Sequence, residues 1–326
     1  MILRTTFDIE PSREKISYFT PVLFIGSCFA FETGRRMEEL KMKVMINPFG
    51  SVYNPVSVGN TIDIIMERKL FGIDDIFRYD NLYHSFFHNT EFSSDNFDIV
   101  IGRINESIIK AHDFLKEASF LFFTFGTARV YRLRENGMIV SNCHKLPSYY
   151  FVEELLSVDS ICEFWMPLLD RIKSFNNRLK TIFTVSPVRY MKEGAHGNQV
   201  SKSVLFLSIE KLLSHPSFPR YFPAYELIID DLRDYRFYND DMVHPSSFAV
   251  NYVFNAFSRA YFSDETICLI NEVMEIVKAS KHRLLSPAGE SAKKFSINIL
   301  DRISAIEKKI PGIDFTGEKE YFNSLI

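Results

Sequence analysis

Residues 20–30 read TPVLFIGSCFA, and this stretch decides the fold. The apolar run Val22–Ile25 lies between Pro21 and Gly26, and residues 29–42, FAFETGRRMEELKM, carry apolar and charged side chains at helical spacing. An apolar run bounded by Pro and Gly predicts a short buried strand, and the amphipathic segment predicts a helix directly after it. The chain therefore starts its first structural unit as strand, tight turn and helix.

The same alternation of buried strand and helix continues along the chain. Further strands are predicted at KVMINPFGS (43–51), SFLFFTFGT (119–127), LKTIFTVSP (179–187) and, shorter, AYELIIDDL (224–232). Helices are predicted over 54–70, 96–118, roughly 151–179 and 201–215. Strands that are apolar on both faces and alternate with helices predict a parallel sheet covered on both sides.

Three segments depart from this alternation. Residues 71–98 lack a clear period and are interpreted as a long irregular insertion. Around 128–146, two alternating runs flank ENG (135–137), which predicts a hairpin. Strand signals stop near residue 262, and two helices, 266–285 and 296–310, follow with a Ser/Pro/Gly turn between them. We therefore expect a catalytic domain over 1–262 and a helical C-terminal extension over 263–326.

Composition excludes several classes of protein. The chain of 326 residues has 46% hydrophobic and 24% charged residues, which is ordinary for a folded domain and unlike disorder. Its net charge of −3 and the absence of a Lys/Arg stripe argue against nucleic acid as a partner. The N-terminal sequence lacks a signal-peptide core, and no apolar stretch is long enough to span a membrane, so we expect a cytoplasmic protein without a membrane partner.

The cysteine and histidine spacings do not indicate a metal centre. Cys28, Cys143, Cys162 and Cys268 are widely spaced and form no CxxC pair, so free thiols are expected in a reducing compartment. His84 and His88 have the spacing of ligands on a helix, but the aromatic sequence around them does not predict one. We expect no metal and no required cofactor.

Chemically useful side chains follow the predicted strands. In open parallel α/β sheets, sites form at the carboxyl ends of the strands. The residues at those ends are Gly26-Ser27-Cys28, Asn47-Pro48-Phe49-Gly50, Gly126-Thr127, Ser186-Pro187-Val188-Arg189 and, after the last strand, Asp241 and His244 in YNDDMVHPSS. A thiol, an imidazole and a carboxylate are thus expected to converge.

This set suits nucleophilic catalysis. Cys28 begins the first helix, where the helix dipole and free amides stabilise a thiolate. Asp241 precedes His244 by three residues, a spacing that lets its carboxylate reach the imidazole Nδ1 and orient the base. Gly50 and the Cys28 amide are natural donors to an acyl oxyanion, because a glycine permits close approach of the backbone.

The segments FIGSCFA, NPFGSVYNP, FGTARVY, NCHK, SPVR and DDMVHPS, in this order, resemble the GSCFA family, whose motifs look like a variant of the SGNH (GDSL-type) hydrolase blocks. The resemblance covers about residues 20–260. It implies a three-layer α/β/α, flavodoxin-like parallel sheet. It also implies an SGNH-like hydrolase or acyltransferase that acts on ester or thioester bonds.

The resemblance also implies roles for single residues. The first SGNH block is Gly-Asp-Ser with serine as nucleophile, so Cys28 takes the nucleophile position and Ser27 that of the aspartate. Gly50 matches the glycine of the second block. Asp241 and His244 match Asp-x-x-His of the last block.

The third block, Gly-x-x-Asn, is where the sequence departs from the pattern. Gly126 matches its glycine and is a candidate oxyanion donor, but Arg129 stands at the asparagine position. One oxyanion donor is therefore unassigned, with Asn47, Asn54 and Asn142 as the candidate replacements.

Acyl transfer through a thioester on Cys28 is the function these residues favour. Water as acceptor makes the protein an esterase, whereas a carbohydrate or other small-molecule hydroxyl makes it an acyltransferase, with acyl-CoA as a candidate donor substrate. Two alternatives stay open: Ser27 as the nucleophile, and a binding module without turnover on the same fold. The residues expected to contact substrate are Asn54, Thr127, Asn142, His144, Lys145 and Arg189.

Overall fold

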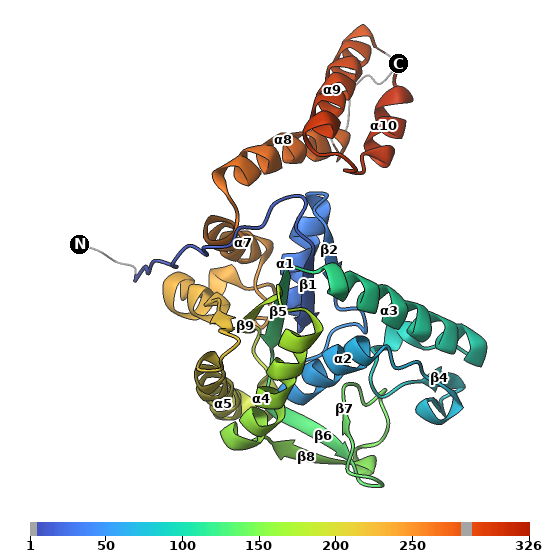
Figure 1. Cartoon of the computed structure of the whole chain (residues 1–326), viewed down its shortest axis with the longest axis vertical. Helices are drawn as coiled ribbons and strands as arrows, with labels where there is room; N and C mark the ends of the chain where they lie inside the picture. The colour runs from blue at the N-terminus through green and yellow to red at the C-terminus, as the bar shows by residue number, and fades with distance from the viewer. Residues whose placement is uncertain (1–4, 282–288) are drawn as a thin grey trace. The chain divides into compact units, whose positions relative to one another are not determined.

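The computed structural model describes residues 5–281 and 289–326 (Figure 1). It divides into two compact units. The first comprises the described residues up to Ile9 together with Pro21–Gly34 and Val44–Phe254, and the second comprises Glu10–Thr20, Arg35–Lys43 and the described part of Asn255–Ile326. The helical unit therefore takes in segments that the sequence analysis assigned to the first domain.

A five-stranded parallel sheet forms the centre of the first unit. Its strands are β1 (Val22–Gly26), β2 (Val44–Ile46), β5 (Phe120–Phe125), β9 (Lys180–Val185) and β10 (Arg220–Tyr221). They lie in the order β10-β9-β5-β1-β2. All pairs are parallel, and β1 is in register with β5 from Val22↔Phe120 to Gly26↔Thr124. This is the flavodoxin-like strand order, so the predicted fold class is confirmed.

Helices cover the sheet. They are α1 (Cys28–Glu39), α2 (Pro55–Glu67), α3 (Phe97–Glu117), α4 (Val158–Phe175), α5 (Gly194–Leu213) and α7 (Ser247–Tyr261). On one face α2 packs against α3 and α4, and α4 packs against α5. On the other face Phe24 and Phe122 stack with ring centroids 4.9 Å apart, and both are buried. Both faces of the sheet are therefore covered, as the apolar strands predicted.

Trp165 of α4 lies in the core between helix and sheet. It is fully buried, its indole N–H donates to the Pro55 carbonyl (3.1 Å), and its ring contacts Phe123, Phe125 and Phe183 at centroid distances of 4.8–5.3 Å. The hydrogen bond joins α4 to the first turn of α2, so the core also sets the position of that turn.

A second, three-stranded antiparallel sheet follows β5. It consists of β6 (Arg129–Leu133), β7 (Ile139–Val140) and β8 (Phe151–Leu155), in the order β7-β6-β8, with the short helix η3 (Ser148–Tyr150) before β8. The helix predicted from residue 151 is wrong in its first part. Phe151–Leu155 pairs with β6, and the helix begins only at Val158, because the Ser157 hydroxyl caps it by accepting from the Ser160 amide (3.0 Å).

Residues 71–98 contain more regular structure than predicted. They form η1 (Ile73–Asp75), the hairpin β3 (Phe77–Tyr79) and β4 (Leu82–His84), and η2 (Thr90–Phe92). The two turn residues, Asp80 and Asn81, both have positive φ (48° and 60°), as a tight two-residue hairpin turn requires.

The strand predicted at 224–232 is helical instead. The chain forms α6 (Ala224–Glu226) and a π-helix, η5 (Leu227–Leu232), followed by η6 (Tyr235–Phe237). Tyr225, Ile228 and Leu232 are buried at a helical spacing of three and four residues. The fifth strand, β10, lies just before this segment.

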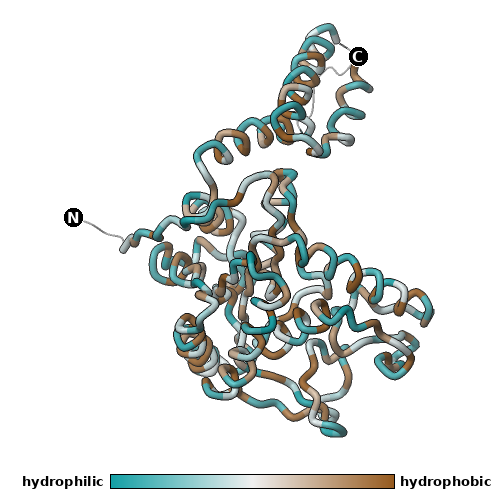
Figure 2. The backbone as a smooth tube through the Cα atoms, viewed as in Figure 1, coloured by the Kyte–Doolittle hydropathy of each residue, from teal (hydrophilic) through white to brown (hydrophobic). Residues whose placement is uncertain are grey.

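The second unit contains α8 (Asp264–Lys281), α9 (Glu290–Lys309) and α10 (Thr316–Asn323). The first two helices were predicted, although residues 282–285 of the first prediction lie outside the described residues. The helix α9 begins at Glu290, six residues before its predicted start. Their sequences alternate hydrophilic and hydrophobic residues along the tube in Figure 2. The short α10 was not predicted; its buried Phe322 packs in this unit, and its Glu318 pairs with Lys41 (2.9 Å).

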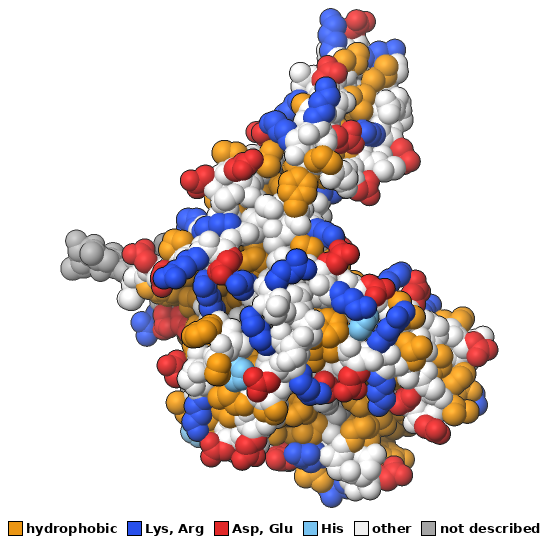
Figure 3. Space-filling model, viewed as in Figure 1, with side chains coloured by type: hydrophobic (Ala, Val, Ile, Leu, Met, Phe, Trp, Pro, Cys, Tyr) orange, Lys and Arg blue, Asp and Glu red, His pale blue; other side chains and the backbone are white. Residues whose placement is uncertain are grey.

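The surface carries charge of both signs. Lys and Arg are interspersed with Asp and Glu on the face shown in Figure 3. Among the described residues, no helix is both long and apolar enough to cross a bilayer.

Candidate active site

The turn after β1 is built around Gly26. Its φ is +151°, and its amide donates to Asn47 Oδ1 (2.8 Å). A Cβ at this position would lie 2.3 Å from the Thr124 carbonyl oxygen of the neighbouring strand. Glycine is therefore required for the chain to leave the sheet here and begin α1 at Cys28.

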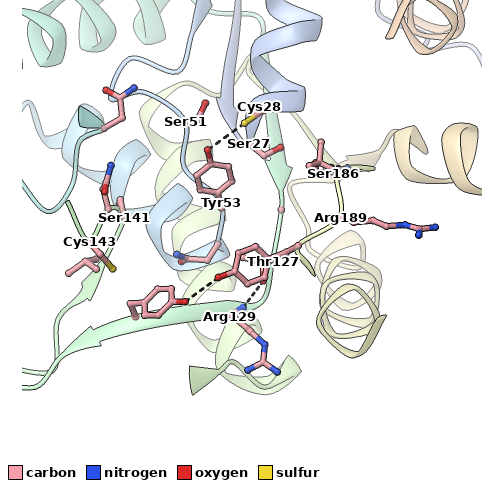
Figure 4. Close-up of a pocket in the computed structure, with 18 of the residues that line it drawn as sticks. Ser27, Cys28, Ser51, Tyr53, Thr127, Arg129, Ser141, Cys143, Ser186 and Arg189 are labelled. Carbon is pink, nitrogen blue, oxygen red and sulfur yellow. Dashed lines mark hydrogen bonds between the residues drawn. The ribbon is translucent and has the colours of Figure 1, made fainter. Parts of the chain in front are cut away.

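Ser27 and Cys28 differ sharply in environment. Ser27 is 2% exposed, its amide donates to the Thr124 carbonyl (3.2 Å), and its hydroxyl accepts from the Phe29 amide (3.3 Å). Cys28 is half-buried, and its Sγ lies 3.4 Å from the hydroxyl of Tyr53 (Figure 4). Both residues line the same pocket.

This pocket has a volume of about 680 Å³ and lies at the carboxyl ends of β1, β5 and β9. The second sheet and the 243–244 loop complete its walls. The predicted site residues that line it are Ser27, Cys28, Asn54, Gly126, Thr127, Asn142, Arg189 and His244. The predicted site residues outside the lining are Asn47, Gly50, His144, Lys145 and Asp241.

Asp241 contacts His244 directly. Its Oδ2 lies 2.6 Å from the imidazole Nδ1, and its Oδ1 accepts from the amides of Val243 and His244, both at 2.9 Å. The amides of His244 and Val243 and the His244 ring together lower the pKa of Asp241 to about 2. An ionised carboxylate at this distance favours the tautomer with the proton on Nδ1.

The amides of two predicted oxyanion donors already donate to backbone carbonyls. The Gly50 amide donates to the Asn47 carbonyl (2.7 Å) in a turn where Gly50 has φ +80°, and the Gly126 amide donates to the Tyr53 carbonyl (2.7 Å). Asn47 Oδ1 accepts from Gly26, so this side chain braces the turn between β1 and α1 from outside the pocket. No acceptor for the Cys28 amide lies within hydrogen-bond distance in the described part of the chain.

The predicted polar contacts inside the pocket also have structural partners. Asn54 caps α2, because its Oδ1 accepts from the Ser57 amide (2.8 Å). The Thr127 hydroxyl bonds to Ser201 Oγ (3.0 Å) and accepts from the Arg129 amide (3.1 Å). Asn142 Oδ1 accepts from the His144 amide (2.8 Å). These side chains shape the pocket walls.

The cationic residues singled out from the sequence lie in three different surroundings. Arg129, at the third-block asparagine position, lies 3.8 Å from carboxylate oxygens of Glu153 and Glu193. The Arg189 side chain points away from the middle of the pocket (Figure 4), with its guanidinium 5.9 Å from the Tyr238 ring. Lys145 lies outside the pocket lining.

His144 belongs to a buried group of histidines rather than to the pocket. Its Nε2 bonds to the Ser85 carbonyl (2.8 Å), its ring lies 4.5 Å from that of His84, and burial lowers its pKa to about 4. His88 is fully buried beside Phe49 (4.2 Å between ring centroids), and burial lowers its pKa to about 3. Among the described residues, no three His, Cys, Asp or Glu side chains converge as metal ligands would.

Two residues near the site were not predicted. Lys202 of α5 is fully buried, and its ammonium donates to the carbonyls of Gly126 and Ser186, both at 2.6 Å. Burial lowers its pKa to about 7. Nothing in the sequence distinguishes this lysine from one on a helix surface. Tyr53 lies within the motif NPFGSVYNP, so its segment was identified but its contact with Cys28 was not.

Comparison with known proteins gives two family matches and distantly similar solved structures. A model described as the GSCFA family matches residues 21–257, and a model described as the GSCFA domain protein, C-terminal domain, matches residues 273–326. A crystal structure of a carbohydrate esterase family 3 from Talaromyces cellulolyticus is similar at 10% identity and a TM-score of 0.35, covering 78% of this chain and 99% of that one. No curated protein matches the chain.

Proposed function

The chain belongs to the GSCFA family, and we propose that it transfers acyl groups through a thioester on Cys28. The observation that carries this proposal is the hydrogen-bonded Asp241–His244 pair (2.6 Å), whose imidazole lines the same pocket as a cysteine at a helix N-terminus. A nucleophile, an oriented base and a pocket are the parts that covalent catalysis needs.

The reaction proceeds in two steps. His244 Nε2 takes the Cys28 proton, the sulfur bonds to the acyl carbon, and the bond to the leaving oxygen or sulfur breaks as that atom receives the proton from the imidazolium. Water or an acceptor hydroxyl, deprotonated by His244, then attacks the acyl carbon of the thioester. The C–S bond breaks, the acyl group leaves on the acceptor oxygen, and the imidazolium returns its proton to the Cys28 sulfur. The Cys28 amide is the backbone donor that supports the oxyanion, because it has no partner of its own in the described residues.

Cys28 is preferred to Ser27 because of its surroundings. The Ser27 hydroxyl is buried and already accepts a hydrogen bond, whereas the Cys28 thiol is half-buried at the pocket wall. A pocket of about 680 Å³ is in the range for a small-molecule substrate, including an acylated carbohydrate or an acyl thioester such as acyl-CoA.

Trapping of the acyl-enzyme tests this function. The protein is mixed with p-nitrophenyl acetate and with acetyl-CoA, and acylated peptides are identified by mass spectrometry in wild type, Cys28→Ala and Ser27→Ala. We expect acetyl on Cys28 in wild type and in Ser27→Ala, and neither acylation nor turnover in Cys28→Ala. Turnover that persists in Cys28→Ala and disappears in Ser27→Ala would instead identify Ser27 as the nucleophile.

A binding module without turnover is the second candidate function. The engagement of the Gly50 and Gly126 amides favours it, because it leaves fewer free donors for an oxyanion than the sequence predicted. No acylation of any variant, together with tight binding of a substrate analogue, would support this second function.

A further inference from the structure

Tyr53 contacts the proposed nucleophile more closely than its place in the sequence suggests. Its hydroxyl lies 3.4 Å from Cys28 Sγ, within hydrogen-bond distance for sulfur, and its side chain lines the pocket (Figure 4). The residue is 43% exposed, so the ring reaches from the wall into the opening of the pocket.

The backbone holds Tyr53 in this position. The Val52 amide donates to the Gly26 carbonyl (3.0 Å), and the Tyr53 carbonyl accepts from the amides of Gly126 (2.7 Å) and Thr127 (3.1 Å). The next residue, Asn54, is the N-cap of α2. The backbone of Val52 and Tyr53 is therefore held by bonds to the end of β1, which leads into the turn before α1, and to the end of its neighbour β5.

The phenol remains a hydrogen-bond donor. Partial burial of the phenol, and next the neighbouring Cys28, raise the pKa of Tyr53 above its usual value, so its hydroxyl carries its proton near neutral pH. The backbone amides of Gly50 and Gly126 donate to the Asn47 and Tyr53 carbonyls instead.

We propose that Tyr53 is a catalytic residue whose hydroxyl donates a hydrogen bond to the Cys28 sulfur and stabilises its thiolate. The inference rests on the proposed function in taking Cys28 as the nucleophile. The proton that leaves Sγ goes to His244 Nε2, while Tyr53 keeps its own proton and forms no bond to the substrate. Because a hydrogen bond to a charged group is a strong one, losing it should lower the fraction of Cys28 present as thiolate by about tenfold or more.

The test is the rate of alkylation of Cys28 by iodoacetamide between pH 5 and 10, measured by peptide mass spectrometry, which separates Cys28 from the other cysteines. Wild type is compared with Tyr53→Phe, Tyr53→Leu and His244→Ala. Tyr131→Phe is the matched control, because the Tyr131 hydroxyl lines the same pocket but bonds to that of Tyr190 (3.1 Å).

We expect Tyr53→Phe and Tyr53→Leu to move the midpoint of the pH–rate profile upward by about one pH unit, which is about tenfold slower alkylation below the midpoint. At high pH, where the thiol is fully ionised, the variants should react as fast as wild type or faster, since a less stabilised thiolate is the better nucleophile. A general loss of structure would slow or speed alkylation at every pH, and circular dichroism would detect it.

The outcomes distinguish a failure of this inference from a failure of the proposed function on which it rests. If the two Tyr53 variants superimpose on wild type while His244→Ala is shifted, the role of Tyr53 is overturned and the cysteine mechanism stands. If His244→Ala also superimposes on wild type, the cysteine mechanism itself fails.

Discussion

A methyl group at Gly26 would clash with the backbone of the neighbouring strand. The φ of +151° at this position and the 2.3 Å that would separate a Cβ from the Thr124 carbonyl oxygen leave no room for a side chain. We expect Gly26→Ala to lower the free energy of unfolding by about 3 kcal/mol or more, measured by urea denaturation. Gly102→Ala is the control: a Cβ there meets nothing within 4 Å, and a helical alanine should stabilise the protein by up to ~1 kcal/mol.

Asp241 bonds to the imidazole Nδ1 of His244, and its side chain is half-exposed. Because it is ionised down to about pH 2, it does not titrate in the range where activity would be measured. We expect Asp241→Asn to lower the rate of deacylation on the order of 10³-fold, because an amide no longer fixes the proton on Nδ1. Thermal unfolding should shift little, since the side chain is half-exposed; a large loss of stability would contradict this assignment.

At the residue scale, the sequence could identify the tight turn after β1 and the Asp241–His244 pair, because each is local. Three residues of spacing are enough to bring a carboxylate onto an imidazole. The oxyanion donors were harder to predict, since whether the Gly50 amide is free depends on a turn closed by the Asn47 carbonyl. The contact of Tyr53 with Cys28 joins residues 25 positions apart, and no local pattern encodes it.

Among the elements, α5 supports the site through a buried lysine. Removing the Lys202 amino group leaves the Gly126 and Ser186 carbonyls without this donor, and both residues line the pocket. We expect Lys202→Met to be destabilised by about 1–3 kcal/mol above pH 9 and to alter the pocket wall.

The difference in stability between wild type and Lys202→Met should depend on pH, and the pKa of the lysine gives the direction. The lysine loses its proton near pH 7 in the folded protein and near 10.5 when unfolded, so between these values the unfolded state binds more protons. The stability of wild type relative to Lys202→Met should therefore rise with pH by about 1.4 kcal/mol per unit across this window. Urea titrations of both proteins at pH 7, 8 and 9 measure it, and a flat difference would mean that the ammonium stays charged.

At the scale of elements, the central strands could be predicted because burial on both faces gives an uninterrupted apolar run. The strand Phe151–Leu155 could not be predicted, because its pairing with β6 is a tertiary interaction. The helical pattern that follows it was extended back over these residues, whereas the helix begins only after its cap at Ser157. The segment 224–232 is short and apolar, and such runs fit a strand or a buried helix equally well.

For the whole molecule, two buried histidines make the free energy of unfolding fall as the pH is lowered. The pKa of His88 is lowered to about 3 and that of His144 to about 4, whereas an unfolded histidine titrates near ~6.5. From pH 6.5 downward the unfolded state binds more protons, so stability is lost as the pH falls, by up to about 1.4 kcal/mol per unit for each histidine, until the folded pKa is reached.

The double variant His88→Asn, His144→Gln keeps a nitrogen at each bonded position and removes the titration. We expect it to be less stable than wild type at pH 7 but to lose stability more slowly between pH 6.5 and 4.5, as followed by urea denaturation. The exposed His196→Gln is the matched control. Equal slopes in wild type and the double variant would contradict the role of these histidines.

Trp165 is the single tryptophan among 326 residues, and it lies fully buried in the core of the first unit. Its fluorescence is therefore an intrinsic optical reporter of that core, with a blue-shifted emission as long as the core stays dry. The helical ellipticity of the protein, in contrast, sums over both units. Recording the two signals in one denaturation experiment shows whether the two units unfold together. Coincident midpoints mean that they do, and separate midpoints measure the stability of each unit without the other.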